Sequence, residues 1–344
     1  MSGRERRTDG ATATVSPIAQ VQAIGYCAGK GTSGSMNAAD IRRVLVLGAG
    51  TMGRQIALYF ALRGSDAVLY DLEEAVLERA VASIRKTVAG LVRQGRVTET
   101  EAGEAVGRIF ATTDAAKAAD GADLVSESVP EDPVLKGRVF SLFHGLCPDR
   151  TLFTTNTSSL VPSMFAAETG RPDRFLALHF HDLSYNRIVD VMPHPGTDEG
   201  SVRVVREFCE RMDLIPIVLQ KEYPGYLFNS MFMALLGAAQ TLAAGGIADV
   251  EEIDRAWMGV FNMPIGPFGL MDRVGLDTVW KVVDFWASMT RDPQAMKNAA
   301  FLKSRVDRGE LGQKTGRGFY AYPGPRFAKP GFVEGRSKEE MEQP

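Results

Sequence analysis

Three glycines near the first apolar segment constrain the fold of this chain more than any other feature. Gly48, Gly50 and Gly53 form a Gly-x-Gly-x-x-Gly pattern between an apolar strand run and an apolar-periodic helix run. Gly48 permits a tight turn, Gly50 lets the backbone approach a ligand, and Gly53 allows the helix to lie close to the strand. The free amides and dipole at the helix start attract a pyrophosphate. We therefore predict a dinucleotide-binding turn, with Thr51 and Met52 beside the phosphates.

An acidic residue follows the next apolar run at the expected distance. Residues 67–70 predict a second strand, and Asp71 comes directly after it. A carboxylate at this place binds the ribose hydroxyls of an adenosine and repels a 2′-phosphate. No Arg follows in residues 72–74, so the pattern favours NAD over NADP. The alternative, a glycine-rich turn in an unrelated α/β protein, does not account for the paired acid.

From Ile41 onwards, short β-branched runs alternate with amphipathic helices, which is typical of βαβ units and a parallel sheet. After Lys221 and Pro224 the β-type runs stop and apolar residues recur at helical spacing. We predict a Rossmann-type doubly wound parallel sheet followed by an all-helical C-terminal domain. Strands are expected at residues 43–47, 67–70, 124–127, 152–155, 175–180, 188–192 and 215–219, and later helices at 250–260, 276–288 and 293–306.

A length of 344 residues exceeds that of a typical single core, which favours two domains. The first residues are rich in Gly, Ser, Thr and Ala without periodicity, as in disordered segments, and Met36 could serve as an alternative start. We expect a disordered leader, an NAD-binding domain, a helical substrate and dimerisation domain, and a flexible tail. Their expected bounds are residues 1–39, 40–221, 222–322 and 323–344.

Composition excludes several classes of protein. The chain is 45% hydrophobic and 24% charged with a net charge of -3, which offers no basic patch for nucleic acid. Cys27, Cys147 and Cys209 are too few and too scattered for a disulfide framework or a zinc site. We find no apolar run long enough for a bilayer and no secretory signal. We therefore expect a cytoplasmic protein with neither membrane nor nucleic-acid partners.

Two of the four histidines lie where an apolar strand run ends. His179 and His181 alternate along residues 175–181, so both point to one face, and Asp190 on the next predicted strand could meet a histidine across the sheet. A carboxylate that accepts from one imidazole nitrogen sets the tautomer and leaves the other nitrogen free. Hydride transfer from an alcohol carbon needs such a base for the hydroxyl proton. We predict this role for one of these two histidines.

Other interpretations of the polar residues stay open. The two histidines with Asp182 or Asp190 could bind a metal, but no further ligand cluster supports this, and we predict no metal site. Either histidine could instead be a satisfied residue at a sheet end, the role that we assign to His144 and His194. Glu131 and Lys136 follow the strand run 124–127 and could contact a dinucleotide or form a solvated helix start. Their positions alone do not decide between the two.

A series of motifs in a fixed order covers residues 42–322. They are Glu131 to Lys136, Thr155-Asn156-Thr-Ser158-Ser159-Leu160, Leu178-His179-Phe180, Pro224-Gly225-Tyr-Leu-Phe-Asn229, Pro264-Ile-Gly266-Pro267-Phe268 and Lys314-Thr-Gly316-Arg-Gly318-Phe319-Tyr320. With the glycine loop, the series resembles the short-chain L-3-hydroxyacyl-CoA dehydrogenases, including bacterial 3-hydroxybutyryl-CoA dehydrogenases. The resemblance implies NAD-dependent oxidation of a 3-hydroxyacyl thioester on CoA or a carrier protein, within fatty acid metabolism. It also implies a homodimer formed through the helical domain.

The resemblance assigns roles to individual residues. His179 is then the general base, and Asp190 takes the place of the family's glutamate partner. Ser158 and Asn229 would hydrogen-bond substrate or cofactor. The cofactor set would comprise Gly48, Gly50, Thr51, Met52, Gly53, Asp71, Glu131, Lys136 and Asn156.

The chain also departs from the family pattern. The family usually reads His-Phe-Phe-Asn-Pro, whereas this chain reads His179-Phe-His181-Asp182-Leu183, and the loop before Asp190 is one residue shorter. Extra polar groups there suggest a polar or unusual acyl portion, and such changes can alter substrate discrimination strongly. Three alternatives therefore stay open: a dehydrogenase for a free hydroxy acid of the carnitine or sugar-acid type, one for a carrier-bound acyl group, and a non-catalytic dinucleotide-binding protein.

Overall fold

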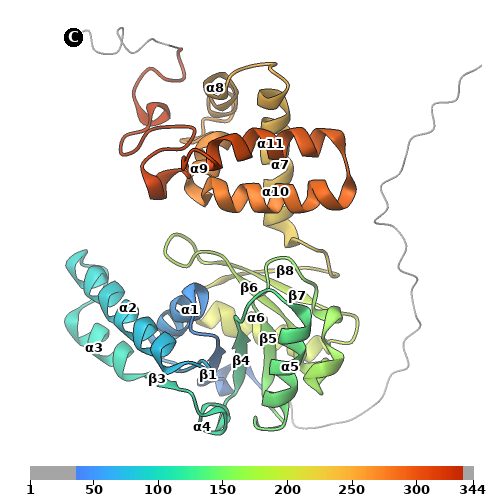
Figure 1. The fold of residues 1–344 in the computed structure, drawn as a ribbon. Helices are drawn as coiled ribbons and strands as arrows, with labels where there is room; N and C mark the ends of the chain where they lie inside the picture. Colours follow the sequence, from blue (N-terminus) through green and yellow to red (C-terminus); the bar gives the residue numbers. More distant parts are fainter. Residues whose placement is uncertain (1–35, 336–344) are drawn as a thin grey trace, which may run out of the picture. The chain divides into compact units, whose positions relative to one another are not determined.

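The computed structural model describes residues 36–335, and within them eight strands form one sheet in the order β3-β2-β1-β4-β5-β6-β7-β8 (Figure 1). The strands are β1 Arg43–Leu47, β2 Asp66–Tyr70, β3 Ile109–Thr112, β4 Leu124–Glu127, β5 Leu152–Thr155, β6 Phe175–Phe180, β7 Ile188–Pro193 and β8 Ile215–Val218. The chain runs outward from β1 to β3 on one side and through β4 to β8 on the other. In such a doubly wound sheet, ligands bind at the carboxyl ends of the strands where the order reverses.

All the predicted strands are present, and β3 is an addition that the sequence did not reveal. This strand has four residues and is only half buried at the sheet edge, so it lacks a strong apolar run. One neighbouring pair also differs from the expected parallel arrangement, because β6 and β7 are antiparallel. The loop between them spans residues 181–187, which is too short for the crossover that a parallel connection requires.

Helices cover both faces of the sheet. They are α1 Thr51–Ala61, α2 Glu74–Arg93, α3 Glu99–Gly107, α4 Ala115–Ala119, α5 Pro133–His144 and α6 Glu199–Arg211. Alternation along β1 separates the two faces: Val44 and Val46 join the core formed with α1, α2 and α6, whereas Leu45 and Leu47 join the core formed with α4 and α5. Both faces of the central strands are therefore buried, as expected for a mostly parallel sheet.

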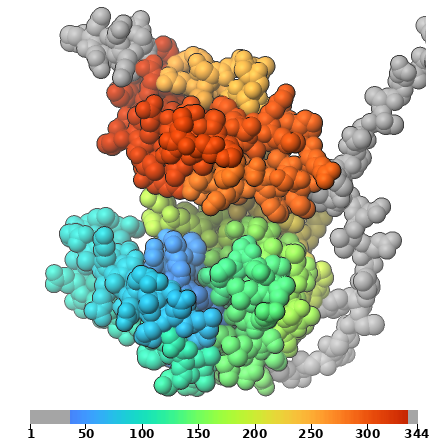
Figure 2. Space-filling model, in the orientation of Figure 1, coloured from blue at the N-terminus to red at the C-terminus, as the bar shows by residue number. Residues whose placement is uncertain are grey.

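The chain after β8 is mainly helical, as predicted. It contains α7 Tyr226–Ala244, α8 Val250–Phe261, α9 Pro267–Val274, α10 Leu276–Thr290 and α11 Pro293–Val306. Leu236, Phe268, Met271 and Leu302 are buried together in its core. Helices α10 and α11 lie side by side and form an extended outer surface (Figures 1 and 2).

The structure corrects the expected bounds of the leader and the tail. Ala38 is buried against the sheet core and Met36 is partly buried there, so the ordered domain begins before residue 40. Phe327 and Phe332 belong to the helical core, and Arg255 Nε donates to Phe332 O at 2.8 Å, so residues 323–335 are not a loose tail. The proline-rich composition of this segment did not indicate that its aromatic side chains are buried. The rest of both predicted segments, with Cys27, lies outside the described residues.

Helix α7 corrects a further expectation. By length and composition it could cross a membrane, with 19 residues and a mean hydropathy of 1.4, whereas the sequence had suggested no such run. Only 17% of its apolar window is buried within this chain, and Leu227, Phe228 and Met231 are exposed. Length and hydropathy do not distinguish a membrane helix from one that a protein surface covers. The exposed apolar face of α7 therefore indicates that another surface, either a membrane or a protein, covers this helix.

Candidate active site

The glycine turn has the geometry that its sequence pattern requires. Gly48 has a φ of +94°, and a Cβ there would lie 2.8 Å from Ser128 O. A Cβ on Gly53 would lie 1.8 Å from Gly48 O, because α1 packs directly on the turn. A Cβ on Gly50, which precedes α1, would meet nothing within 4 Å. Side chains are thus excluded at two glycines by the protein, while the third faces open space.

Asp71 is joined to the same turn. Its Oδ2 accepts a hydrogen bond from Ala49 N at 2.8 Å, directly after β2 ends at Tyr70. Thr51 and Met52 are the first two residues of α1, so their amides lack acceptors within the helix. The turn therefore fits a dinucleotide without a 2′-phosphate. It offers open space at Gly50, the positive end of the 11-residue helix α1, and the carboxylate of Asp71.

His179 and Asp190 form a buried pair across two strands. They are direct partners in the antiparallel β6–β7 register, and His179 Nδ1 lies 3.0 Å from Asp190 Oδ2. The two side chains are only 6% and 2% exposed. Burial acts to raise the pKa of Asp190, but the hydrogen bond from His179 and the close approach of His181 outweigh it and lower that pKa to about 2. An ionised carboxylate only accepts, so Nδ1 carries the hydrogen and Nε2 is the basic nitrogen.

His181 approaches the same carboxylate. Its Nε2 lies 3.2 Å from Asp190 Oδ2, within ion-pair distance, although the angle is not that of a hydrogen bond. Among residues 36–335 this buried nitrogen has no hydrogen-bond partner. Its ring meets His179 edge-on at 4.6 Å and Phe228 of α7 at 5.2 Å. The sequence placed both histidines on one face, but it did not indicate that they share one oxygen.

Three ligand atoms of the kind that hold metals therefore lie close together. The candidate atoms of His179, His181 and Asp190 are within 4.8 Å of one another. A metal would have to displace the hydrogen that His179 Nδ1 donates to Asp190. We keep the prediction that the active form holds no metal.

Glu131 and Lys136 meet after β4, where Lys136 is buried and the Glu131 side chain is 37% exposed. Lys136 Nζ donates to Glu127 Oε1 at 2.7 Å and to Val129 O at 3.1 Å, and lies 3.3 Å from Glu131 Oε2. Burial raises the pKa of Glu127 despite the opposing charge of Lys136. Lys136 thus has three protein acceptors. Sequence reasoning missed Glu127, whose signal was a carboxylate inside an apolar strand run.

Glu131 also holds the turn that carries Ser158. Its Oε1 accepts from Ser158 N at 3.1 Å, from Ser159 N at 3.2 Å, and from the hydroxyls of Ser159 and Thr157. Burial acts to raise the pKa of Glu131, but the hydrogen bond from Thr157 and the charge of Lys136 lower it overall. The Thr157–Ser159 turn is therefore fixed by an ionised carboxylate. Thr157 is a second residue that the sequence did not single out.

Asn156 connects the strand ends between the glycine turn and His179. Its Nδ2 donates to Ser128 Oγ at 3.3 Å, and its Oδ1 accepts from Phe180 N at 2.8 Å. Because Gly48 lies against Ser128 and Phe180 follows His179, one set of contacts joins the two halves of the predicted site. The ends of these strands therefore lie together at one edge of the sheet.

Helix α7 contributes two groups to the same place. Asn229 Nδ2 donates to Ser158 O at 3.5 Å, which brings together the two residues expected to contact substrate or cofactor. The ring of Tyr226 is fully buried and lies 4.8 Å from that of His179. Burial raises the pKa of Tyr226 well above its ordinary value, so its hydroxyl is neutral.

Comparisons with known proteins agree with this geometry. Two family models match: "3-hydroxyacyl-CoA dehydrogenase, NAD binding domain" over residues 43–223 and "3-hydroxyacyl-CoA dehydrogenase, C-terminal domain" over residues 225–322. The mitochondrial hydroxyacyl-coenzyme A dehydrogenase of Mus musculus is 32% identical over 288 residues, which are 82% of this chain and 91% of that protein. The 3-hydroxybutyryl-CoA dehydrogenase of Mycobacterium tuberculosis is 32% identical over 284 residues, which are 82% and 99%.

Solved structures show the same likeness. A diketoreductase that acts on dicarbonyl compounds superposes with a TM-score of 0.77 and 38% identity, covering 82% of this chain and 99% of its own. The (S)-3-hydroxybutyryl-CoA dehydrogenase of Ralstonia eutropha gives 0.74 and 31%, covering 82% and 99%. With the family models matched along nearly all of residues 43–322, the chain belongs to the NAD-dependent 3-hydroxyacyl-CoA dehydrogenase family.

Proposed function

We propose that this protein interconverts a 3-hydroxyacyl thioester, carried by CoA, and the matching 3-ketoacyl thioester. The observation that carries the proposal is the buried His179–Asp190 pair at the end of the strand that Asn156 ties to the glycine turn. Bound NAD supplies the hydride acceptor for such a reaction. The pair supplies the proton acceptor that alcohol oxidation requires.

His179 acts through its Nε2. In oxidation this nitrogen takes the proton of the 3-hydroxyl group, and the ring becomes an imidazolium. Asp190 keeps the hydrogen on Nδ1 and stabilises the positive charge across 3.0 Å. In the reverse direction the same ring returns the proton to the carbonyl oxygen.

Neighbouring polar groups orient the reactants. Ser158 and Asn229 are in contact and face the substrate carbonyl or the nicotinamide in our proposal. Asn156 holds the backbone beside His179, while Glu131 and Lys136 hold the Ser158 turn and border the cofactor. Near-attack geometry is a large part of enzymatic rate enhancement, so a rigid turn here favours catalysis.

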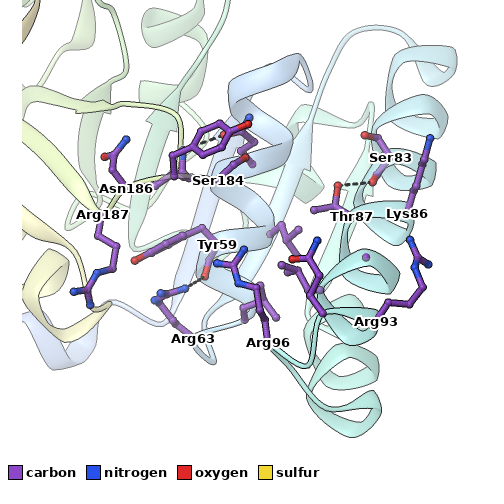
Figure 3. A pocket seen from close by; sticks show the side chains of 18 residues that line it. Tyr59, Arg63, Ser83, Lys86, Thr87, Arg93, Arg96, Ser184, Asn186 and Arg187 are labelled. Atoms are coloured by element: carbon purple, nitrogen blue, oxygen red, sulfur yellow. Dashed lines mark hydrogen bonds between the residues drawn. The ribbon is translucent and has the colours of Figure 1, made fainter. Parts of the chain in front are cut away.

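A basic pocket supports CoA as the carrier of the acyl group. A pocket of about 700 Å³ lies between α1, α2 and the loop after His181, and Lys86 and Arg93 of α2 lie across it from Arg187 (Figure 3). Arg63 and Arg187 are paired with Asp213. Phosphate groups of CoA are polyanionic and match a surface of this charge. The cationic lining residues are Arg63, Lys86, Arg93, Arg96 and Arg187.

One alternative function has a specific observation in its favour. The diketoreductase is 38% identical to this chain, compared with 31% for the hydroxybutyryl-CoA enzyme of Ralstonia eutropha. Together with the polar His181, this favours a free dicarbonyl compound or hydroxy acid as the second candidate substrate. A carrier-protein thioester and a non-catalytic dinucleotide-binding role are the remaining alternatives.

Reduction of three substrates with the same acyl group separates these candidates. NADH consumption is measured with acetoacetyl-CoA, an acetoacetyl carrier-protein thioester and free acetoacetate. We expect the CoA ester to have the highest kcat/KM and His179→Gln to abolish most of it. A higher kcat/KM for free acetoacetate would instead favour a free dicarbonyl compound as the substrate, as for the diketoreductase. NADH binding without turnover on any of the three would leave only the binding role.

The helical domain is our proposed dimerisation domain. We propose that its boundary with the NAD-binding domain lies at residues 221–222, between the end of β8 at Val218 and the start of α7 at Tyr226. Phe228 and Met231 on α7, and Phe285, Trp286 and Met289 on α10, are large apolar side chains that are exposed, and exposed apolar surface often marks an interaction site. A second copy of the chain covers this surface in our proposal, in a cytoplasmic homodimer that acts in fatty acid metabolism. Sedimentation analysis of wild type and Met231→Glu tests the dimer.

A further inference from the structure

His181 gives the Asp190 carboxylate a second imidazole neighbour. His181 Nε2 and His179 Nδ1 lie 3.2 Å and 3.0 Å from the same Asp190 oxygen. Within residues 36–335, the Asp190 side chain has no other polar partner. A carboxylate this buried is stable as an ion only when donors surround it, so both rings matter to its position.

Packing keeps His181 beside Asp190. Its ring lies edge-on to His179, with 70° between the planes, and edge-on to Phe228, with 80°. Its Nε2 is buried, and within residues 36–335 Asp190 is the one acceptor near it, at an angle outside the range of a hydrogen bond. A small ring rotation would align the hydrogen bond. Leaving that donor unpaired is unfavourable, so the contact to Asp190 is the one available way to satisfy it.

We propose that His181 is a positioning residue that acts through Asp190 and lets His179 work as the base only while His181 itself is neutral. This inference rests on the proposed function. As a neutral ring, His181 donates to the same Asp190 oxygen as His179 and keeps the carboxylate directed at His179 Nδ1. Asp190 is a short side chain, and a donor on a second side limits its rotation.

The net charge of the cluster of His179, His181 and Asp190 explains why the protonation state of His181 matters. With Asp190 ionised and both rings neutral, the cluster carries one negative charge, and it becomes neutral when His179 takes the substrate proton. If His181 is already protonated, the same step would create a net positive charge in a buried site, which is unfavourable. The titratable groups that face His181 and its partners are His179 from β6, Asp190 from β7 and Tyr226 from α7, which stays neutral.

The acid side of the pH profile tests this dependence. Oxidation of a 3-hydroxyacyl-CoA is followed from about pH 5 to about pH 9 in wild type, His181→Phe and His181→Gln. Two groups must lose protons in the wild type, so log kcat/KM rises with a slope of two at low pH. Both variants lack the second titrating ring and are expected to show a slope of one. His181→Phe is expected to lose about tenfold in kcat with little change in KM, and His181→Gln, which keeps a donor, to recover most of it.

His194→Gln is the matched control. His194 is a buried histidine on the loop after β7, and its ring bonds to Pro172 O and Gly196 N, away from Asp190. We expect this variant to keep the slope of two. A slope of one in His194→Gln, or an unchanged slope and kcat in His181→Phe, would overturn the inference. NADH binding, followed by fluorescence, shows whether each variant is folded, and His181→Gln carries the slope test if His181→Phe is not.

The proposed function fails separately from this inference. If wild type turns over no 3-hydroxyacyl or 3-ketoacyl thioester, both are rejected. If wild type is active and His179→Gln is not, while His181→Phe matches wild type in slope and kcat, only the role of His181 is rejected.

Discussion

Asp190 stands directly opposite His179 in the antiparallel β6–β7 pair, and its carboxylate lies 3.0 Å from the ring. Direct pairing in an antiparallel ladder brings Cα atoms to within about 5.5 Å, so a short aspartate reaches its partner without a bend in either strand. The missing methylene, compared with the glutamate expected from the family pattern, is offset by register. The chemistry of this site is therefore linked to one pair of strands.

Asp190→Asn is expected to reduce kcat by about a hundredfold to ten-thousandfold. An amide has no charge to stabilise the imidazolium, and it can turn its NH₂ group toward His179 Nδ1, which reverses the tautomer. NADH binding is expected to stay near wild type, because the polar partners of Asp190 are His179 and His181 and not residues of the glycine turn. Steady-state kinetics and a fluorescence titration check both parts. Wild-type kcat in Asp190→Asn would remove the carboxylate from the mechanism.

Asp190 is also expected to make the fold sensitive to acid. Its pKa is lowered to about 2, so its contribution to the free energy of unfolding is present above the unfolded value near 3.8. That contribution is lost as pH falls toward 2, and the shift corresponds to about 2 kcal/mol. Urea unfolding of wild type and Asp190→Asn checks this. The difference between them should shrink as pH falls from about 5 to about 2.5, and a constant difference would contradict the assignment.

The contribution of Asp254 to the free energy of unfolding is expected to change with pH in the opposite direction. It is fully buried and accepts from Phe268 N, Gly269 N and the Tyr320 hydroxyl, but desolvation raises its pKa to about 6. The folded chain therefore binds a proton that the unfolded chain has released. The stabilisation is complete below the unfolded value near 3.8 and is lost as pH rises through about 6.

The measurement for Asp254 is again a difference in unfolding free energy. Relative to Asp254→Asn, which does not titrate, wild type should lose about 3 kcal/mol between the two limits of this window. A flat difference for Asp254→Asn would show that its carboxyl is ionised throughout.

The glycine turn offers a matched pair of substitutions. Gly53→Ala should destabilise the fold strongly, because its Cβ would lie 1.8 Å from Gly48 O. Gly50→Ala has free space and an ordinary φ of -68°, so its Tm should stay near wild type. The added methyl group would nevertheless occupy the place where a pyrophosphate approaches the backbone, and we expect the Kd for NADH to rise about tenfold or more. Unchanged NADH binding in Gly50→Ala would place the phosphates elsewhere.

Local patterns predicted much of this protein. The turn at Gly48 and the acid at Asp71 are recognisable because their roles depend on neighbours a few residues away and on one following strand. Buried strands show as apolar runs for a similar reason. The sequence did not predict the edge strand β3, because a half-exposed strand of four residues has no such apolar run. The burial of Phe327 and Phe332 in the helical core was not predicted either, because no neighbouring residue in the chain indicates it.

Contacts between distant segments were beyond local patterns. Residue order put His179 and His181 on one face and offered Asp190 as a partner, but only the β6–β7 register shows that both rings meet one oxygen of that carboxylate. Likewise, Glu131 supports Ser158 across 27 positions of chain. Such contacts are decided by how strands align and helices pack, because the energy of a buried charge depends on every group around it, wherever that group lies in the chain.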